Sequence, residues 1–224
     1  MAQHLDLEEQ EQLDQLKHFW KKHGNWITWV LIAGLAVFAA WNVYQYWQRN
    51  RAAQASALYE EVERAARSGD SSRVERAFTD LREQFGSTEY AQQAGLLAGK
   101  AFFDKGNADA AKAALTWVAE KSSDDGLQAV ARLRLAGVLA EAKSYEDALK
   151  QLGGSFPKDF EPLVADRKGD IYALQGKNTE AVAEYRKAYQ GLEAQAEYRR
   201  AVEVKLTALG IDAKAGAAAA GGKS

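Results

Sequence analysis

The sequence GDIYALQGKNTEAVAEYRKAY, residues 169–189, contains the pattern that decides the fold. Gly169 and Ala181 are small residues, placed where two antiparallel helices would approach each other closely. Gly176 lies between them and lets the backbone leave the first helix in a left-handed turn. The stretch therefore predicts a helical hairpin. The positions that define it are Gly169, Tyr172, Gly176, Ala181, Tyr185 and Ala188.

The pattern recurs three times before residue 169, in steps of 33, 37 and 37 residues. The nearest copy passes through Leu135, Ala136, Leu139, Ala148, Leu152 and Ser155. The next contains Gly99, Phe102, Gly106, Ala111, Leu115 and Val118, and the first, most degenerate copy contains Val62, Ala65, Gly69, Val74, Phe78 and Leu81. These offsets resemble the tetratricopeptide pattern, so we expect an all-α solenoid of about four hairpins. Residues 193–209 are amphipathic and predict a capping helix.

A second stretch, WITWVLIAGLAVFAAWNVYQYW at residues 26–47, precedes the repeats. No charged residue occurs between Asn25 and Gln48. As a helix, this run is about 36 Å long, which exceeds a hydrocarbon core of roughly 30 Å. Aromatic residues of the kind that favour the headgroup region mark both ends. The sequence thus predicts one transmembrane helix, with the membrane-interface anchors Trp26, Trp29, Trp41, Tyr44 and Trp47.

A cleaved signal peptide is the alternative interpretation of this segment. A secretory leader begins with a short basic region, whereas most of the 25 residues before Trp26 are acidic or neutral. The cleavage-like triplet Ala55-Ser56-Ala57 lies well past the apolar run. We therefore expect an uncleaved anchor. The lysines at 17, 21 and 22 slightly outnumber Arg49 and Arg51, which favours a cytoplasmic N-terminus.

The composition argues against several kinds of function. The chain has no cysteine and a net charge of −2, so it offers neither thiolate ligands nor the basic block of a nucleic-acid-binding protein. Its histidines are His4, His18 and His23, all before the span, and no phosphate-binding loop is present. We expect no enzyme activity, no metal, no cofactor and no small-molecule substrate.

The first helix of each hairpin would line a concave surface that could bind a polypeptide. That surface mixes apolar, aromatic and charged groups, as a peptide-binding groove would. The plainer interpretation is that some of these residues only stabilise neighbouring helices. The candidate groove residues are Tyr59, Glu63, Gln93, Leu96, Lys100, Phe103, Leu133, Glu141, Asp166 and Asp170.

An acidic tail, a single span, degenerate repeats and a low-complexity end follow one another in this chain. This order, with phrases such as DIYALQGKNTEAVAEYRKAY, resembles the YfgM-type inner-membrane proteins of Gram-negative bacteria. The resemblance implies an ancillary subunit of the SecYEG translocon that also contacts periplasmic chaperones. It further implies that the tail at 1–24 is cytoplasmic and the repeats at 49–211 are periplasmic, on either side of the transmembrane helix at 25–48. The low-complexity composition of the end, 212–224, predicts disorder. An assembly factor for another envelope complex, such as cytochrome c maturation, is the alternative.

Overall fold

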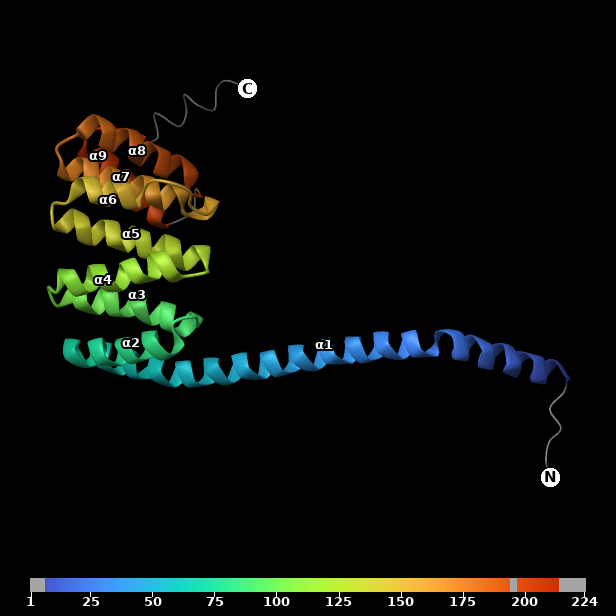
Figure 1. Cartoon of the computed structure of the whole chain (residues 1–224). Helices are drawn as coiled ribbons and strands as arrows, with labels where there is room; N and C mark the ends of the chain where they lie inside the picture. The colour runs from blue at the N-terminus through green and yellow to red at the C-terminus, as the bar shows by residue number, and fades with distance from the viewer. Residues whose placement is uncertain (1–6, 194–196, 214–224) are drawn as a thin grey trace, which may run out of the picture. The chain divides into compact units, whose positions relative to one another are not determined.

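The computed structural model describes residues 7–193 and 197–213, and within these residues every regular element is helical (Figure 1). The chain divides between Arg51 and Ala52 into two compact units. We call residues 7–51 the anchor unit and residues 52–213 the repeat unit. The predicted all-α class is confirmed. The disorder predicted for 212–224 falls almost entirely outside the described residues.

The anchor unit consists of a single helical segment. Helix α1 spans Leu7–Ser68, so it contains the apolar stretch and also the first helix of the first repeat. It is the one helix among the described residues that is long and apolar enough to cross a membrane. The predicted span is therefore helical, as expected from its length and its lack of proline.

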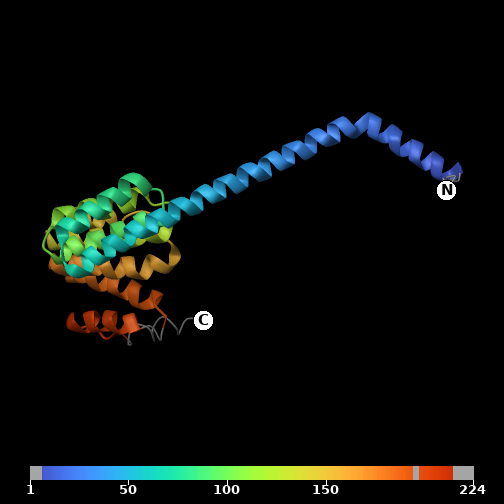
Figure 2. The same cartoon turned by 90° about the horizontal axis from the view of Figure 1, so that it is seen from below.

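The repeat unit contains four helical hairpins and a closing helix, as the sequence predicted. Figures 1 and 2 show these helices stacked in chain order from the end of α1 to α9. The hairpins pair the end of α1 with α2, α3 with α4, α5 with α6, and α7 with α8. The bounds are α2 Ser71–Phe85, α3 Glu89–Asp104, α4 Ala108–Lys121, α5 Asp125–Glu141, α6 Tyr145–Gln151, α7 Glu161–Leu174, α8 Asn178–Gly191 and α9 Glu197–Ala208.

Each hairpin turns through one residue with a positive φ. Gly69, Gly106 and Gly176 have φ values of 70°, 78° and 73°, and Lys143 takes the same place in the third hairpin with φ 61°. At each turn, the next residue donates its backbone N–H to a carbonyl of the preceding helix, as Asn107 does to Phe102 at 2.9 Å. This arrangement satisfies carbonyl groups at the helix end. The glycine turns were predicted, whereas the lysine turn was not.

Small residues bring the two helices of a hairpin together. A Cβ added at Gly169 would lie 2.5 Å from the Tyr185 ring, and one added at Gly99 would lie 2.7 Å from Leu115 Cγ. Ala181 is fully buried. These contacts support the register that the sequence predicts for the second and fourth hairpins.

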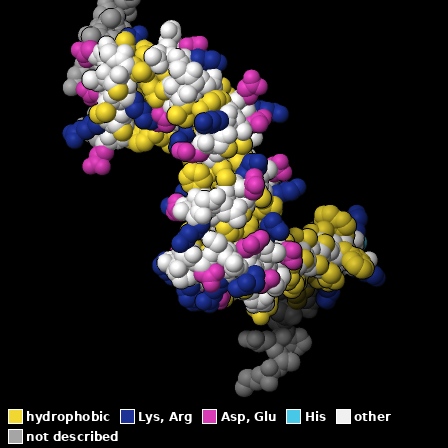
Figure 3. All heavy atoms as spheres, turned by 90° about the vertical axis from the view of Figure 1, so that its left-hand side faces the viewer, with side chains coloured by type: hydrophobic (Ala, Val, Ile, Leu, Met, Phe, Trp, Pro, Cys, Tyr) yellow, Lys and Arg dark blue, Asp and Glu magenta, His cyan; other side chains and the backbone are white. Residues whose placement is uncertain are grey.

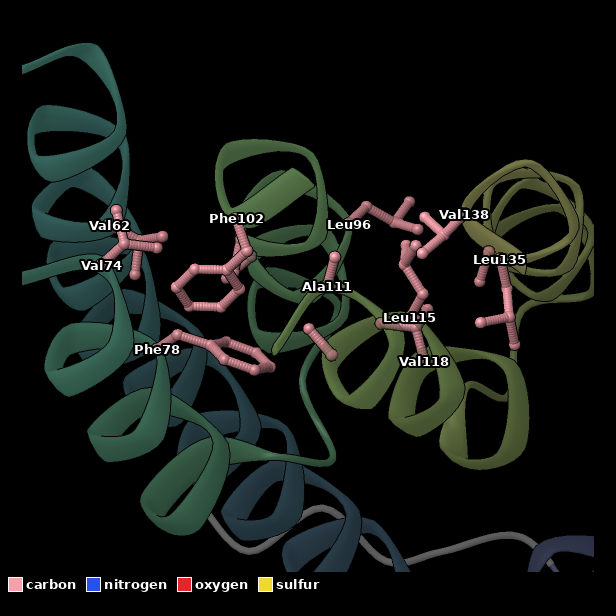
Figure 4. Packing of buried hydrophobic residues seen from close by; sticks show 14 of the residues in the cluster. Val62, Val74, Phe78, Leu96, Phe102, Ala111, Leu115, Val118, Leu135 and Val138 are labelled. Carbon is pink, nitrogen blue, oxygen red and sulfur yellow. The ribbon is translucent and has the colours of Figure 1, made fainter. Parts of the chain in front are cut away.

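Buried apolar side chains form a continuous core through the first three hairpins and into α7. Figure 4 shows Val62, Val74, Phe78 and Phe102 meeting at one end, and Leu115, Val118, Leu135 and Val138 meeting further along. A second cluster joins α8 to α9 through residues such as Tyr185, Val202 and Leu206. The last hairpin and the capping helix therefore share a core of their own.

The third hairpin departs from the predicted pattern. Helix α6 ends at Gln151, so Ser155, expected inside its second helix, is non-helical and exposed. Gly153 and Gly154 follow the helix, and Gly154 has φ 84°, a conformation that favours glycine. A short 3-10 helix, η1 (Lys158–Phe160), then leads into α7.

Candidate functional site

The apolar stretch of the anchor unit presents its large side chains outward. Trp26 and Trp29 at one end are 70% and 64% exposed, and Trp41, Tyr44 and Trp47 at the other end are 49–59% exposed. Aromatic rings with a polar edge are suited to a membrane–water interface. In water, such a surface would be a large unburied apolar area, so a lipid environment is its natural complement.

Polar side chains inside this stretch bond to their own helix. Thr28 Oγ1 donates to the carbonyl of Gly24 at 2.8 Å, and Asn42 Nδ2 donates to the carbonyl of Phe38 at 2.8 Å. In a bilayer no water is available, so a polar group must find its partner within the protein. These bonds let both residues lie in an apolar segment at a modest desolvation cost.

The candidate groove is best formed between the first two hairpins. The rings of Tyr59 and Tyr90 lie 6.0 Å apart, one from α1 and one from α3. Burial raises the pKa of Tyr59, and the charge of Glu63 raises it further. One turn beyond Tyr59, a hollow of about 220 Å³ is lined by Glu63, Ala66, Arg67, Leu97, Lys100, Ala101 and Asp104.

Charged side chains rim this hollow without closing it. On α3, Lys100 Nζ lies 2.5 Å from the carboxylate of Asp104. On α1, the guanidinium of Arg67 lies 3.5 Å from the carboxylate of Glu63. The side chains of both pairs are largely exposed. Phe103 is 38% exposed on α3. Figure 3 shows charges of both signs interspersed with hydrophobic side chains on one face of the repeat unit. Such a surface is suited to holding a polypeptide, with apolar contacts giving affinity and charges giving register.

Other predicted groove residues serve the fold or lie apart from the hollow. Leu96 is 8% exposed and points toward Val138 in the core (Figure 4). Leu133 is half-buried against the same core. Gln93 donates to Glu89 at 2.7 Å on its own helix, while Glu141 is exposed at the end of α5. For Leu96 and Leu133, the plainer interpretation, stabilisation of neighbouring helices, therefore holds.

The two aspartates expected at the far end of the groove are held by the capping helix. Asp166 is only 2% exposed, and it accepts hydrogen bonds from Tyr198 Oη at 2.5 Å and from Lys205 Nζ at 2.8 Å. Asp170 accepts from Tyr185 Oη at 2.8 Å and lies 2.7 Å from Lys205 Nζ. Because α9 supplies these partners, Asp166 is not an open groove residue and Asp170 is already engaged.

This polar cluster was missed as a unit by sequence reasoning, although a signal existed. Asp166 and Asp170 are one helical turn apart, and Tyr198 and Lys205 are two turns apart, so each pair shares a helix face. Burial raises the pKa of Tyr185 and of Tyr198 well above the ordinary value, and the hydrogen bonds to the aspartates raise both further. The cluster is thus built to hold neutral tyrosines against charged carboxylates.

The acidic and histidine side chains of the described residues are the ones that a metal site would require. The residues that the structure describes contain no group of three histidine, aspartate or glutamate side chains placed to hold a metal ion. His18 and His23 are exposed on α1, and His4 lies outside the described part of the chain. The surfaces described above offer contact area and charge, which are the means of a binding protein.

Comparison with known proteins places these features in a family. The profile of the tetratricopeptide repeat-like domain matches residues 17–211. An "Ancillary SecYEG translocon subunit" of Neisseria gonorrhoeae is 35% identical over 93% of this chain and 100% of its own length. Proteins of the same name are 29% identical in Haemophilus influenzae (82% of this chain, 90% of that one) and 28% identical in Escherichia coli (75% and 81%).

The match to the Neisseria protein extends over nearly all of both chains, and the domain profile covers the end of the tail, the apolar stretch and the repeats. The helical hairpins of the repeat unit agree with the tetratricopeptide repeat-like description of the matching family model. The chain belongs to the tetratricopeptide repeat-like family of ancillary SecYEG translocon subunits, the YfgM-type proteins.

Proposed function

We propose that this chain is a membrane-anchored scaffold that associates with the SecYEG translocon and helps handle newly translocated proteins. The observation that carries the proposal is the full-length similarity to relatives named as ancillary subunits of that translocon. The exposed apolar stretch would hold the chain in the bacterial inner membrane as a single-pass protein. The repeats would supply the contact surface.

The proposed orientation places the N-terminus in the cytoplasm and the repeats in the periplasm. Lys17, Lys21 and Lys22 before the span slightly outnumber Arg49 and Arg51 after it, which favours retention of the N-terminal side. In this orientation the repeats would meet chains as they emerge and could also contact periplasmic chaperones. The chaperone link rests on the family resemblance alone.

The binding surface we favour is the open part of the candidate groove. It comprises the Tyr59–Tyr90 pair, the hollow between Glu63 and Lys100, and Phe103. We propose that this surface binds a polypeptide, because its groups provide apolar contact area and charges of both signs. The relatives' names favour the translocon over the alternative of cytochrome c maturation.

Photocrosslinking in cells tests this proposal. A photoreactive amino acid replaces Tyr59, Lys100 or Phe103 in the full chain, and crosslinked partners are identified after membrane solubilisation. We expect translocon subunits at these positions and far fewer at Lys112, an exposed lysine on α4 outside the hollow. Capture of cytochrome maturation proteins in place of the translocon would favour the alternative.

Protease treatment of spheroplasts tests the orientation separately. We expect the repeats to be digested from outside while the N-terminal tail is protected. Protection of the repeats together with digestion of the tail would reverse the proposed topology.

A further inference from the structure

The short helix of the third hairpin leaves a hollow in the repeat unit. Helix α6 has 7 residues, whereas α2, α4 and α8 have 14 or 15. Beyond its end lies a hollow of about 570 Å³, a volume within the range of specific binding sites. The first turns of α7 and the last turns of α8 form its walls. Its lining residues include Leu152, Ser155, Phe156, Pro162, Val164 and Ala165.

Lysine side chains outnumber carboxylates among the residues that line this hollow. Three lysines line it, Lys158, Lys168 and Lys187, against two glutamates. Lys187 is paired with Glu184 at 2.5 Å. Within residues 7–193 and 197–213, Lys158 and Lys168 have no carboxylate within ion-pair distance. The remaining acid, Glu161, lies in the first turn of α7, where the helix dipole already favours a carboxylate.

The wall formed by the α6–α7 connection is fixed in place by Arg132. Its guanidinium donates to the backbone carbonyls of Gln151, Gly153 and Ser155, and it lies 4.0 Å from the centre of the Phe156 ring. Burial lowers the pKa of Arg132 from its ordinary value. Because the connection is held by three bonds from one side chain, the hollow is formed before any partner arrives.

A second hollow, about 340 Å³, lies along the same connection and shares Ser155 and Phe156 with the first. Arg132 and Asp125 both line it. The charge of Arg132 is met by backbone carbonyl groups, and Asp125 lies in the first turn of α5, where the helix dipole favours a carboxylate. An extended ligand could therefore contact both hollows along the connection. Uncompensated cations next to apolar walls are complementary to a ligand that carries carboxylates and apolar side chains together.

We propose that these hollows bind an extended segment of a partner protein in which acidic and apolar side chains alternate. Carboxylates of the segment would pair with Lys158 and Lys168, and an apolar side chain would rest against Phe156 and Pro162. The site uses a different face of α7 from Asp166 and Asp170, which α9 engages. It goes beyond the proposed translocon association and does not depend on it.

Fluorescence anisotropy on the full chain in detergent tests the proposal. The probe is a short labelled peptide of alternating aspartate and leucine, and its matched control has asparagine in place of aspartate. We expect the aspartate peptide to bind and the asparagine peptide to bind about tenfold more weakly or worse. The double variant Lys158→Glu/Lys168→Glu should weaken binding of the aspartate peptide by at least about tenfold.

Two further variants separate a specific site from general charge effects. Lys112→Glu/Lys121→Glu makes the same change in net charge on α4 and should leave binding unchanged. Ser155→Trp places a large side chain at an exposed position shared by both hollows and should also weaken binding. Circular dichroism confirms that each variant folds. Equal binding of both peptides, an equal loss in the α4 variant, or no binding by the unmodified chain would overturn the proposal.

Discussion

The third and fourth hairpins each depend on one cation, but the third hairpin supplies its own from α5, whereas the fourth takes its cation from the capping helix α9. In the third hairpin, Arg132 of α5 binds the carbonyls left open where α6 stops early. In the fourth, Lys205 of α9 pairs with the carboxylates of Asp166 and Asp170 on α7. Arg132 binds backbone carbonyls that further turns of α6 would otherwise have satisfied. Lys205 holds the capping helix α9 against α7. A repeat can therefore vary in length while its polar groups remain satisfied.

The attachment of the capping helix should be the more sensitive of the two. Lys205→Met would leave the buried carboxylate of Asp166 without its counter-charge. Removal of one partner of a buried pair typically costs 3–5 kcal/mol, and because Lys205 is 31% exposed we expect a smaller loss, about 2–3 kcal/mol. Denaturant unfolding of the repeat unit within the full chain measures it. Lys187→Met, which breaks an exposed pair with Glu184, should cost under about 1 kcal/mol.

A comparable loss in the two lysine variants would mean that Asp166 is neutralised in another way. The double variant Asp166→Asn/Lys205→Met separates the two explanations. It removes the unpaired charge, so it should recover part of the stability lost in Lys205→Met.

The second largest loss of stability is expected where Arg132 holds the connection after α6. Arg132→Met keeps much of the apolar stem but removes three bonds from a cationic donor, so we expect a loss of about 2 kcal/mol. Hydrogen exchange should rise in residues 152–160 and change little in the turn at Gly176. Arg132→Lys should not restore protection, since an ammonium lacks the planar fork that reaches several carbonyls. Unchanged exchange in 152–160 would show that the glycines and prolines alone hold the connection.

Alkaline pH offers a way to weaken the fourth hairpin and leave the third intact. The pKa values of Tyr185 and Tyr198 are raised by burial and by their bonds to Asp170 and Asp166. Unfolded tyrosine ionises near pH 10, so above that pH the folded state holds more protons than the unfolded state. The stabilisation is complete below about pH 10 and is lost as the pH rises further.

We therefore expect the melting temperature to fall as the pH rises above about 10, with a shallower fall in Tyr185→Phe/Tyr198→Phe. The double variant is less stable at neutral pH because two hydrogen bonds are lost, so the slope with pH, and not the melting temperature itself, is the diagnostic quantity. Arg132→Met should retain the slope of the unmodified chain. Identical slopes in the unmodified chain and the tyrosine variant would contradict the proposed role of these hydroxyl groups.

The difference between the two hairpins also shows what could be predicted from sequence. The fourth hairpin follows local rules: Gly176 forms the turn, Gly169 admits the Tyr185 ring, and each signal lies within the hairpin itself. The early end of α6 was signalled by Gly153 and Gly154, but the repeat register carried the predicted helix past them to Ser155. The prediction assumed that each repeat has a full second helix, and it therefore gave too little weight to the two glycines that end this one.

Contacts between residues far apart in the sequence could not be predicted by the same reasoning. Arg132 contacts carbonyls 19–23 residues away, and Lys205 contacts an aspartate 39 residues away. Periodicity places a residue on a helix face but does not say which neighbour covers that face. For this reason Asp166 was assigned to an open groove, whereas the capping helix covers it.

The smallest predicted effect concerns the one turn that lacks glycine. Lys143 adopts φ 61°, where a Cβ atom is unfavourable by roughly 1–2 kcal/mol, while glycine loses about 0.5–1 kcal/mol of backbone entropy on folding. Lys143→Gly should therefore stabilise the repeat unit by about 0.5–1 kcal/mol, seen as a higher denaturant midpoint with an unchanged slope. The reciprocal change is Gly106→Lys at φ 78°. No atom lies within 4 Å of an added Cβ there, so its cost reports the backbone conformation alone. We expect a loss of similar size. If Lys143→Gly were destabilising while Gly106→Lys behaved as expected, the lysine side chain would have to make a favourable contact at its own turn, and the third hairpin would differ from the others in a third respect.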